Sequence, residues 1–337
     1  MSSRTKSRTS PANMGDRAYK VVSALLGSSA FIFLFLILGV LLIFSYPSLI
    51  VNGIGFFTRV TWNPNISGSV TVIHGIRAMS NASYGMLVFF LGTLLSSGLA
   101  LLIAVPISLG IAVFLTEVAP RRVSFGLSFF VELLAGIPSI VFGFWGFLVL
   151  GPFLKVYIEP GMATYLSFIP YFRGPVLSYG LPASGVILAL MIVPIIASIS
   201  RDAMSQTPLE LKEAAMALGT TRWETTRRVV LPYARTAILG SVVLGLGRAL
   251  GETMAVAMVS QSAVNLLPTN FYYPINSLAA FMAQTLDSAF TDPTSMEVYA
   301  LVELALVLLA ITTTVNIIAR LMVRQGFISS AEHVVQV

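Results

Sequence analysis

Six long apolar stretches dominate this chain of 337 residues. A helix needs about 20 apolar residues to cross the roughly 30 Å hydrocarbon layer of a membrane. The stretches lie at about 22–45, 84–115, 123–150, 180–199, 237–260 and 297–319. Only 10% of the residues are charged, whereas about a quarter are charged in a soluble domain. The sequence therefore predicts an all-α integral membrane protein with six transmembrane helices.

The distribution of lysine and arginine decides how the longest stretch crosses. Residues 84–115 could form one long helix or two short ones, broken near Ser96-Ser97-Gly98 or at Pro106. With one crossing, 15 of the 20 basic residues fall on one side: five in the N-terminal tail, two after this stretch, six in the loop 201–236 and two near the C-terminus. Four fall on the other side, and Arg248 lies inside a stretch. Because basic residues concentrate in cytoplasmic loops, we predict one crossing and cytoplasmic termini.

The composition excludes several kinds of site. Cysteine is absent, and the two histidines, His74 and His333, are far apart, so there is no disulfide, thiol nucleophile or histidine metal centre. The phosphate-binding pattern G-x-x-x-x-G-K-[ST] is also absent. We therefore expect this chain to bind no cofactor, and any ATP hydrolysis to occur on another chain.

Two predicted outer loops are unusually apolar. In the loop 151–179, residues 162–172 are too short to span and predict an interfacial or re-entrant helix. The loop 261–296 holds Phe271-Tyr272-Tyr273-Pro274, followed by a helix-like run over 275–290. These aromatic residues fit either anchoring at the membrane interface or a platform for an extracytoplasmic partner.

The basic loop 201–236 carries a spaced pattern that predicts helix, turn, helix. Pro208 suits a helix start, Gly219 suits a left-handed helix end, and Thr221 with Glu224 forms a capping box. Small residues allow close contact with a partner, the acid can pair with a basic group, and the glycine permits a sharp turn. The pattern consists of Glu213, Ala214, Ala215, Gly219, Leu231 and Pro232. This loop either docks on a separate protein or lies on its own bundle.

Ionisable residues also lie inside the predicted spans: Arg248 and Glu252 in the fifth, Glu132 in the third and Glu303 in the sixth. Such charges cost about 3 kcal/mol each and tend to mark function. Counted along the spans, Glu132 falls near the depth of Arg248, and Glu303 near that of Glu252. Arg248 and Glu252 share a helix face at i,i+4 in the less favourable order, so we expect a second partner for the arginine, either Glu132 or a bound anion. The alternative is that these residues form only interhelical ion pairs.

Three segments together resemble the PstC permease subunits of bacterial phosphate ABC importers. They are Arg248-Ala-Leu-Gly-Glu252-Thr-Met-Ala, Glu132-Leu-Leu-Ala-Gly-Ile-Pro-Ser139 and the inner-loop pattern. The resemblance covers roughly residues 20–325. The loop pattern alone is typical of the whole importer superfamily, whereas the Arg-Ala-Leu-Gly-Glu-Thr string is typical of the phosphate branch, including its sister subunit PstA.

The resemblance implies a type I importer permease in the bacterial cytoplasmic membrane. Its partners would be PstA, two copies of the PstB ATPase holding ATP and Mg, and the phosphate-binding protein PstS, with no nucleic acid. The family's intramembrane Arg and Glu correspond to Arg248 and Glu252, and Glu132 joins them in the expected substrate pathway. The expected organisation is a disordered cytoplasmic tail (1–20), a first transmembrane helix with an outer loop (21–83), a permease core (84–325) containing the coupling loop 201–236, and a cytoplasmic C-terminal tail (326–337).

The expected activity is ATP-driven import of inorganic phosphate by alternating access. One alternative from the same class is an importer of sulfate or molybdate. A channel or secondary transporter working alone is a second alternative, and a membrane sensor scaffold that moves nothing is a third.

Overall fold

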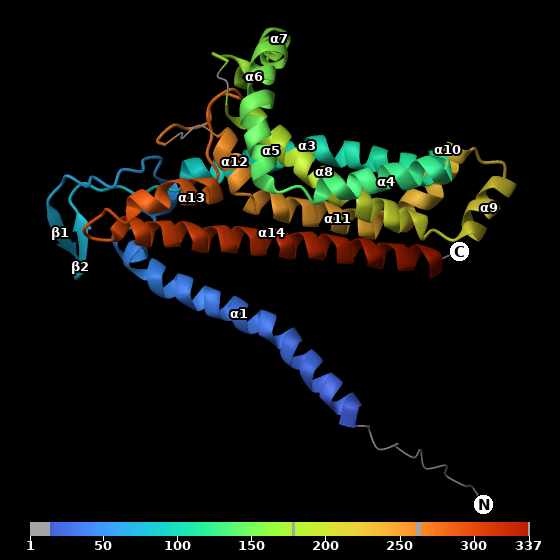
Figure 1. Cartoon of the computed structure of the whole chain (residues 1–337), viewed down its shortest axis with the longest axis horizontal. Helices are drawn as coiled ribbons and strands as arrows, with labels where there is room; N and C mark the ends of the chain where they lie inside the picture. The colour runs from blue at the N-terminus through green and yellow to red at the C-terminus, as the bar shows by residue number, and fades with distance from the viewer. Residues whose placement is uncertain (1–13, 177–178, 261–263, 336–337) are drawn as a thin grey trace, which may run out of the picture.

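The computed structural model describes residues 14–176, 179–260 and 264–335, and the regular secondary structure of this part is helical apart from one small hairpin (Figure 1). Six of its helices are long and apolar enough to cross a membrane. They cover Gly15–Asn52, Leu87–Val118, Ser139–Tyr165, Leu181–Ser205, Arg222–Gly251 and Met296–Leu321. The predicted all-α fold with six spans is confirmed, and the long stretch predicted at 84–115 forms one helix.

Several spans contain short π-helical turns, in which the hydrogen bonds reach one residue further than in an α-helix. The first span is α1 (Met14–Asn52), the second is α3 (Leu87–Val113) with η1 (Phe114–Val118), the fourth is α8 (Leu181–Ser205) and the sixth belongs to α14 (Met296–Val335). The third consists of α5 (Ser139–Trp145), η2 (Gly146–Leu150), α6 (Gly151–Phe153), η3 (Leu154–Ile158) and α7 (Glu159–Tyr165). The fifth consists of α10 (Arg222–Thr225), η5 (Thr226–Val230) and α11 (Leu231–Gly251). The other elements are α2 (Gly55–Thr58), β1 (Val70–Ile73), β2 (Ile76–Met79), α4 (Arg121–Ala135), the short 3₁₀ turn η4 (Pro170–Phe172), α9 (Leu209–Ala217), α12 (Met254–Val259) and α13 (Leu278–Ala289).

Helix α8 is the centre of the bundle. In its most apolar 18-residue window 67% of the residues are buried, against 28% or less in the other five spans. It packs between α3 and α11, with Ala100 and Ala104 of α3 and Ile192 and Ile196 of α8 in one buried cluster. The other spans keep broad apolar surfaces exposed, as expected where helices face lipid or a second subunit.

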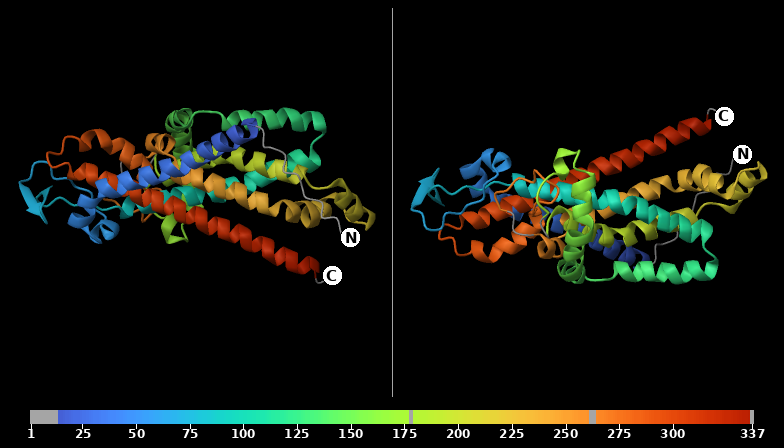
Figure 2. Two further views of the ribbon diagram at one scale, coloured as in Figure 1. Left: turned by 90° about the horizontal axis from the view of Figure 1, so that it is seen from below. Right: turned by 90° about the horizontal axis from the view of Figure 1, so that it is seen from above.

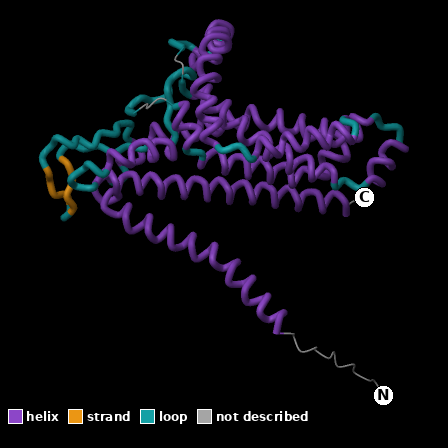
Figure 3. Tube along the Cα trace, viewed as in Figure 1, coloured by secondary structure: helices purple, strands orange, loops and turns teal. Residues whose placement is uncertain are grey.

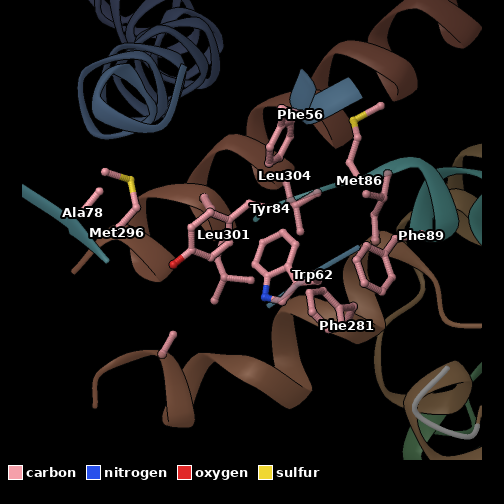
Figure 4. Packing of buried hydrophobic residues seen from close by; sticks show 13 residues of the cluster. Phe56, Trp62, Ala78, Tyr84, Met86, Phe89, Phe281, Met296, Leu301 and Leu304 are labelled. Atoms are coloured by element: carbon pink, nitrogen blue, oxygen red, sulfur yellow. The ribbon is translucent and has the colours of Figure 1, made fainter. Parts of the chain in front are cut away.

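An aromatic cluster closes the end of the bundle that carries the hairpin (Figure 4). Trp62 packs edge-on against Phe281 of α13 at 5.0 Å between ring centroids, and Phe89 of α3 stacks on the same ring at 3.8 Å. The indole Nε1 of Trp62 donates to a carboxylate oxygen of Glu297, at the start of α14, over 3.0 Å. The segment between α1 and α3 is therefore fixed to α13 and α14.

The third span differs from the prediction. The stretch expected as one helix over 123–150 is divided at Gly136-Ile137-Pro138 into α4 and the rod α5–α7. Figure 1 shows α4 running along the bundle and α5–α7 rising from it at a steep angle. A proline disfavours helical geometry in the residue before it, and here α4 ends three residues before Pro138. The span is therefore Ser139–Tyr165 rather than 123–150.

The outer loops are partly as expected. The helix-like run over 275–290 is confirmed as α13, whereas the segment predicted as a helix over 162–172 is helical only to Tyr165 and again in η4. The antiparallel hairpin β1–β2 was not predicted; its turn uses His74 and Gly75 at φ values of 51° and 82°. Figures 2 and 3 place this hairpin at the end of the molecule opposite α9.

Candidate functional site

Arg248 lies on the last turn of α11, beside a cavity of about 470 Å³. The cavity is shared with Asn316 of α14 and Gly247, and its other walls are the apolar side chains of Ile195, Val243 and Leu244. Arg248 is exposed and makes no hydrogen bond or ion pair with any residue that the structure describes. The chain thus presents a guanidinium and an amide in otherwise apolar surroundings, open to whatever lies against this face.

Glu252 does not share a helix face with Arg248, contrary to the prediction. Helix α11 ends at Gly251, and Glu252 takes an extended conformation with ψ of 126°. Its Oε1 accepts a hydrogen bond of 3.3 Å from the backbone N–H of Ala255, in the first turn of α12. The carboxylate therefore caps the following helix, which removes the expected i,i+4 pair.

Glu132 is also placed differently from the expectation. It lies on α4, and its Oε1 accepts a hydrogen bond of 3.1 Å from the guanidinium of Arg201, near the end of α8. It lines a second cavity, of about 650 Å³, between η1, α4, α8 and α9. Arg248 is not part of that cavity, so of the two partners expected for Arg248, Glu132 or a bound anion, Glu132 is not its partner in this structure.

Glu303 of α14 is fully buried against α1. Its Oε2 accepts a hydrogen bond of 2.6 Å from the hydroxyl of Ser48, whose oxygen in turn accepts one of 3.0 Å from the amide of Asn52. Two helices are thereby joined by a polar contact near the C-terminal end of α1. The sequence placed Glu303 at a depth near that of Glu252, but the hydrogen bonds of the two carboxylates are with Ser48 and Ala255.

Asn316 is the candidate residue that the motif analysis did not single out. It lies on α14, near the end of the sixth span, Met296–Leu321, which is otherwise strongly apolar. Its Oδ1 is 3.6 Å from the position that a Cβ on Gly247 would take, so the amide lies directly against the turn that carries Arg248. A lone amide inside an apolar span is the sequence signal that could have found it.

The inner-loop pattern folds as predicted into a helix, a turn and a second helix. Glu213, Ala214 and Ala215 lie on α9, and Gly219 turns the chain with φ of +86°. The capping box is present: the backbone N–H of Thr221 donates to the Glu224 carboxylate over 2.8 Å, and the N–H of Glu224 donates to the Thr221 hydroxyl over 3.3 Å. The second helix is the start of the fifth span, so that span begins at Arg222 rather than near 237.

The surface of this segment is strongly apolar for a part of the chain outside the bundle. Leu218 is 87% exposed and Trp223 is 62% exposed, with Leu209, Leu211 and Met216 also exposed on α9. Leu231 and Pro232 lie at the start of α11, and Pro232 lines a cavity together with Leu211 of α9. Exposed apolar side chains gathered on one segment mark a surface that contacts another molecule.

Comparisons with known proteins agree with this architecture. Residues 104–325 match the family described as "Binding-protein-dependent transport system inner membrane component". The "Phosphate transport system permease protein PstC 1" of Mycobacterium tuberculosis is 46% identical over 279 residues, covering 81% of this chain and 82% of the relative. The corresponding PstC protein of Haemophilus influenzae is 40% identical over 312 residues, covering 91% and 93%.

The fold recurs in a solved bacterial alginate ABC transporter with its periplasmic protein. The match has a TM-score of 0.59 at 17% identity and covers 91% of this chain and 96% of that one. At this identity the likeness concerns the fold alone. With six apolar helices and these relatives, the chain is a multi-pass protein of the cytoplasmic membrane that belongs to the binding-protein-dependent transport system inner membrane components and, within them, to the PstC permeases of phosphate transport systems.

Proposed function

We propose that this chain is the permease subunit of an ATP-driven importer and carries inorganic phosphate across the cytoplasmic membrane by alternating access. The observation that carries the choice of substrate is the guanidinium of Arg248, which has no partner among the described residues and lies beside Asn316 in an otherwise apolar cavity. Relatives that are 40–46% identical bear the name of phosphate transport permeases, which supports the same choice.

The chemistry of the cavity fits a tetrahedral oxyanion. Burying an arginine without a counter-charge is unfavourable in a membrane, so its charge is balanced from outside the chain. A guanidinium presents a planar set of N–H donors that can bind two oxygens of one phosphate, and the amide of Asn316 adds a further donor. The three carboxylates expected near this site are turned to other partners: Glu132 to Arg201, Glu252 to Ala255 and Glu303 to Ser48.

The cavity lies on an open face of the chain, so the substrate path runs along the seam with a second permease subunit. Arg248 and Leu244 of α11 and Ile317 of α14 are exposed near it. In the importer, this face would meet a PstA-like subunit, and phosphate would pass between the two chains. The proposal thus places the path between two subunits rather than inside one chain.

The segment 206–221 is the coupling device in this proposal. Its exposed apolar residues seat α9 in a separate PstB-like ATPase, two copies of which bind ATP and Mg. Closure of the ATPases moves α9, and the motion reaches the bundle through α8 and α10.

A phosphate-loaded, PstS-like protein docks at the opposite end of the bundle, where the hairpin and α13 lie (Figure 1). Phosphate enters, pairs transiently with Arg248 and leaves to the cytoplasm when hydrolysis resets the bundle.

Arg248→Gln tests the proposal. Gln keeps much of the side chain's length but removes the charge, so we expect ATP-driven phosphate uptake to fall by at least about tenfold, the loss expected for one charge-assisted hydrogen bond, while the complex still assembles. The assay is uptake of labelled phosphate by proteoliposomes that contain all subunits and the loaded binding protein. Arg320→Gln, on an exposed position of α14, is the matched control and should transport normally. Normal uptake by Arg248→Gln would refute the role assigned to this residue.

The same vesicles separate the alternative functions. Competition by unlabelled sulfate or molybdate as strong as that by phosphate would indicate a different oxyanion importer. Transport by this chain alone, without ATP, would indicate a channel or secondary transporter. A complex in which no substitution in the spans changes uptake would indicate a sensor scaffold.

A further inference from the structure

Helix α9 touches its own bundle on one narrow face only. Pro208, Lys212 and Ala215 are partly buried along one side of the segment, whereas the remaining residues of α9 are exposed. The hydrogen bonds at its end are local: the hydroxyl of Thr220 donates to the carbonyl oxygen of Ala215 over 2.8 Å. Most of the surface of α9 is therefore free for a partner, and its attachment to the bundle rests on few contacts.

One of these contacts is a close ion pair with a different span. The Nζ of Lys212 donates to Oε1 of Glu117 over 2.7 Å, and the two side chains are 19% and 17% exposed. This pair joins α9 to the second span, which is distant from it along the chain. Low exposure on both sides limits screening by water and salt, so the pair holds more firmly than an exposed one.

Glu117 is placed where a displacement would spread to two helices. It belongs to η1, the π-helical end of the second span, and α4 follows after Ala119 and Pro120. The hydroxyl of Ser124 on α4 donates to the carbonyl oxygen of Leu115 over 2.7 Å, which ties the start of α4 to the same turn. A pull on Glu117 therefore acts on the inner ends of both α3 and α4.

We propose that the Lys212–Glu117 pair is a coupling strut, through which movement of α9 displaces the inner ends of α3 and α4. The inference rests on the proposed function, in which a separate ATPase moves α9. Without the strut, α9 would pull only on α8 and α10, its neighbours in the chain, and the second span would follow the motor poorly. Lys212 and Glu117 are thus positioning residues for transport, acting away from the phosphate path.

Charge reversal tests the strut directly. Lys212→Glu and Glu117→Lys are measured singly and together in the complete complex, reconstituted with the loaded binding protein. Each single reversal sets like charges against each other, so we expect phosphate transported per ATP hydrolysed to fall about tenfold while ATP hydrolysis continues. The double reversal restores the attraction and should return this ratio to within about threefold of the unmodified complex. Arg122→Glu makes an equal charge change at an exposed position of α4, and it should leave the phosphate transported per ATP hydrolysed unchanged.

The outcomes distinguish the strut from the general function. Single reversals that couple normally, or a double variant no better than the singles, would overturn the strut. An unmodified complex without ATP-driven uptake would overturn the proposed function instead. If a single reversal prevents assembly, Lys212→Met and Glu117→Gln remove one charge each with little change in shape, and normal coupling in both would equally overturn the strut.

Discussion

At the scale of single residues, the charged side chains that the sequence placed inside the spans differ in how the chain balances them. Glu132 forms an ion pair with Arg201, and the Glu303 carboxyl accepts a hydrogen bond from the hydroxyl of Ser48. Arg248, in contrast, has no partner among the described residues. An unpaired charge at membrane depth persists where a ligand or another subunit compensates it. The contrast between these residues, rather than the presence of charge alone, supports the proposal that the substrate site lies at α11.

Asn316 allows the cavity to be tested separately from the charge of Arg248. Asn316→Ala removes the donor, and we expect phosphate uptake to fall about tenfold, as for the loss of one hydrogen bond to a charged ligand. Asn316→Asp adds a negative charge facing the guanidinium, so uptake should fall further. The measurement is the initial uptake rate in proteoliposomes with all subunits. Thr314→Ala, on an exposed position of the same helix, is the control. Equal, normal rates in Asn316→Ala and Asn316→Asp would remove Asn316 from the site.

At the scale of elements, proline position explains the irregular turns. In the described part of the chain, four π-helical turns, ending at Val118, Leu150, Ile158 and Val230, are each followed two residues later by a proline. Proline lacks an N–H and its ring clashes with the carbonyl four residues before it, and a wider turn relieves both problems. The relation is not general, because Pro47, Pro106 and Pro194 lie inside ordinary α-helix.

The same elements show what the sequence could and could not predict. Hydropathy and basic residues predicted six spans, and the turn chemistry of Gly219 and Thr221 predicted the helix, turn and helix of the loop 201–236, because both signals are local. The partners of Glu132 and Glu252 depend on where helices break and which way each face points. Depth counted along an assumed continuous span contains neither quantity, so Glu132 could be considered as a partner of Arg248, whereas the structure pairs it with Arg201.

The contact of α5 with α12 depends on a glycine. A Cβ on Gly143 would lie 2.9 Å from the Cα of Ala255, a backbone atom that cannot move aside, so Gly143→Ala should push α12 away. We expect a loss of about 1–3 kcal/mol in stability, typical of overpacking, seen as a lower melting temperature of the purified complex. Gly126→Ala in α4 has open space around its Cβ and should melt at the same temperature or higher. Equal melting of the two variants would contradict the close packing.

At the scale of the whole molecule, the two ends of the bundle have different chemistry. The hairpin, α13 and the aromatic cluster around Trp62 form one end, and α9 and the C-terminal part of α14 lie at the other (Figures 1 and 2). The basic residues Lys212, Arg222, Arg227 and Arg228 belong to the α9 end. The proposed mechanism requires this basic end in the cytoplasm, where the ATPases are, and the hairpin outside, where a binding protein can dock.

The absence of cysteine allows this orientation to be measured with single probes. His74→Cys places a thiol at the hairpin turn, and Leu218→Cys places one on the coupling segment, where the native side chain is 87% exposed. A membrane-impermeant maleimide added to intact spheroplasts should label the first, and label the second only after permeabilisation. Leu304→Cys, at a fully buried position, should remain unlabelled until the protein is denatured. Coexpression of the ATPase subunit should then protect Leu218→Cys, because α9 is expected to lie within that interface. Labelling of Leu218→Cys from outside would reverse the topology, and with it both the coupling segment and the Lys212–Glu117 strut.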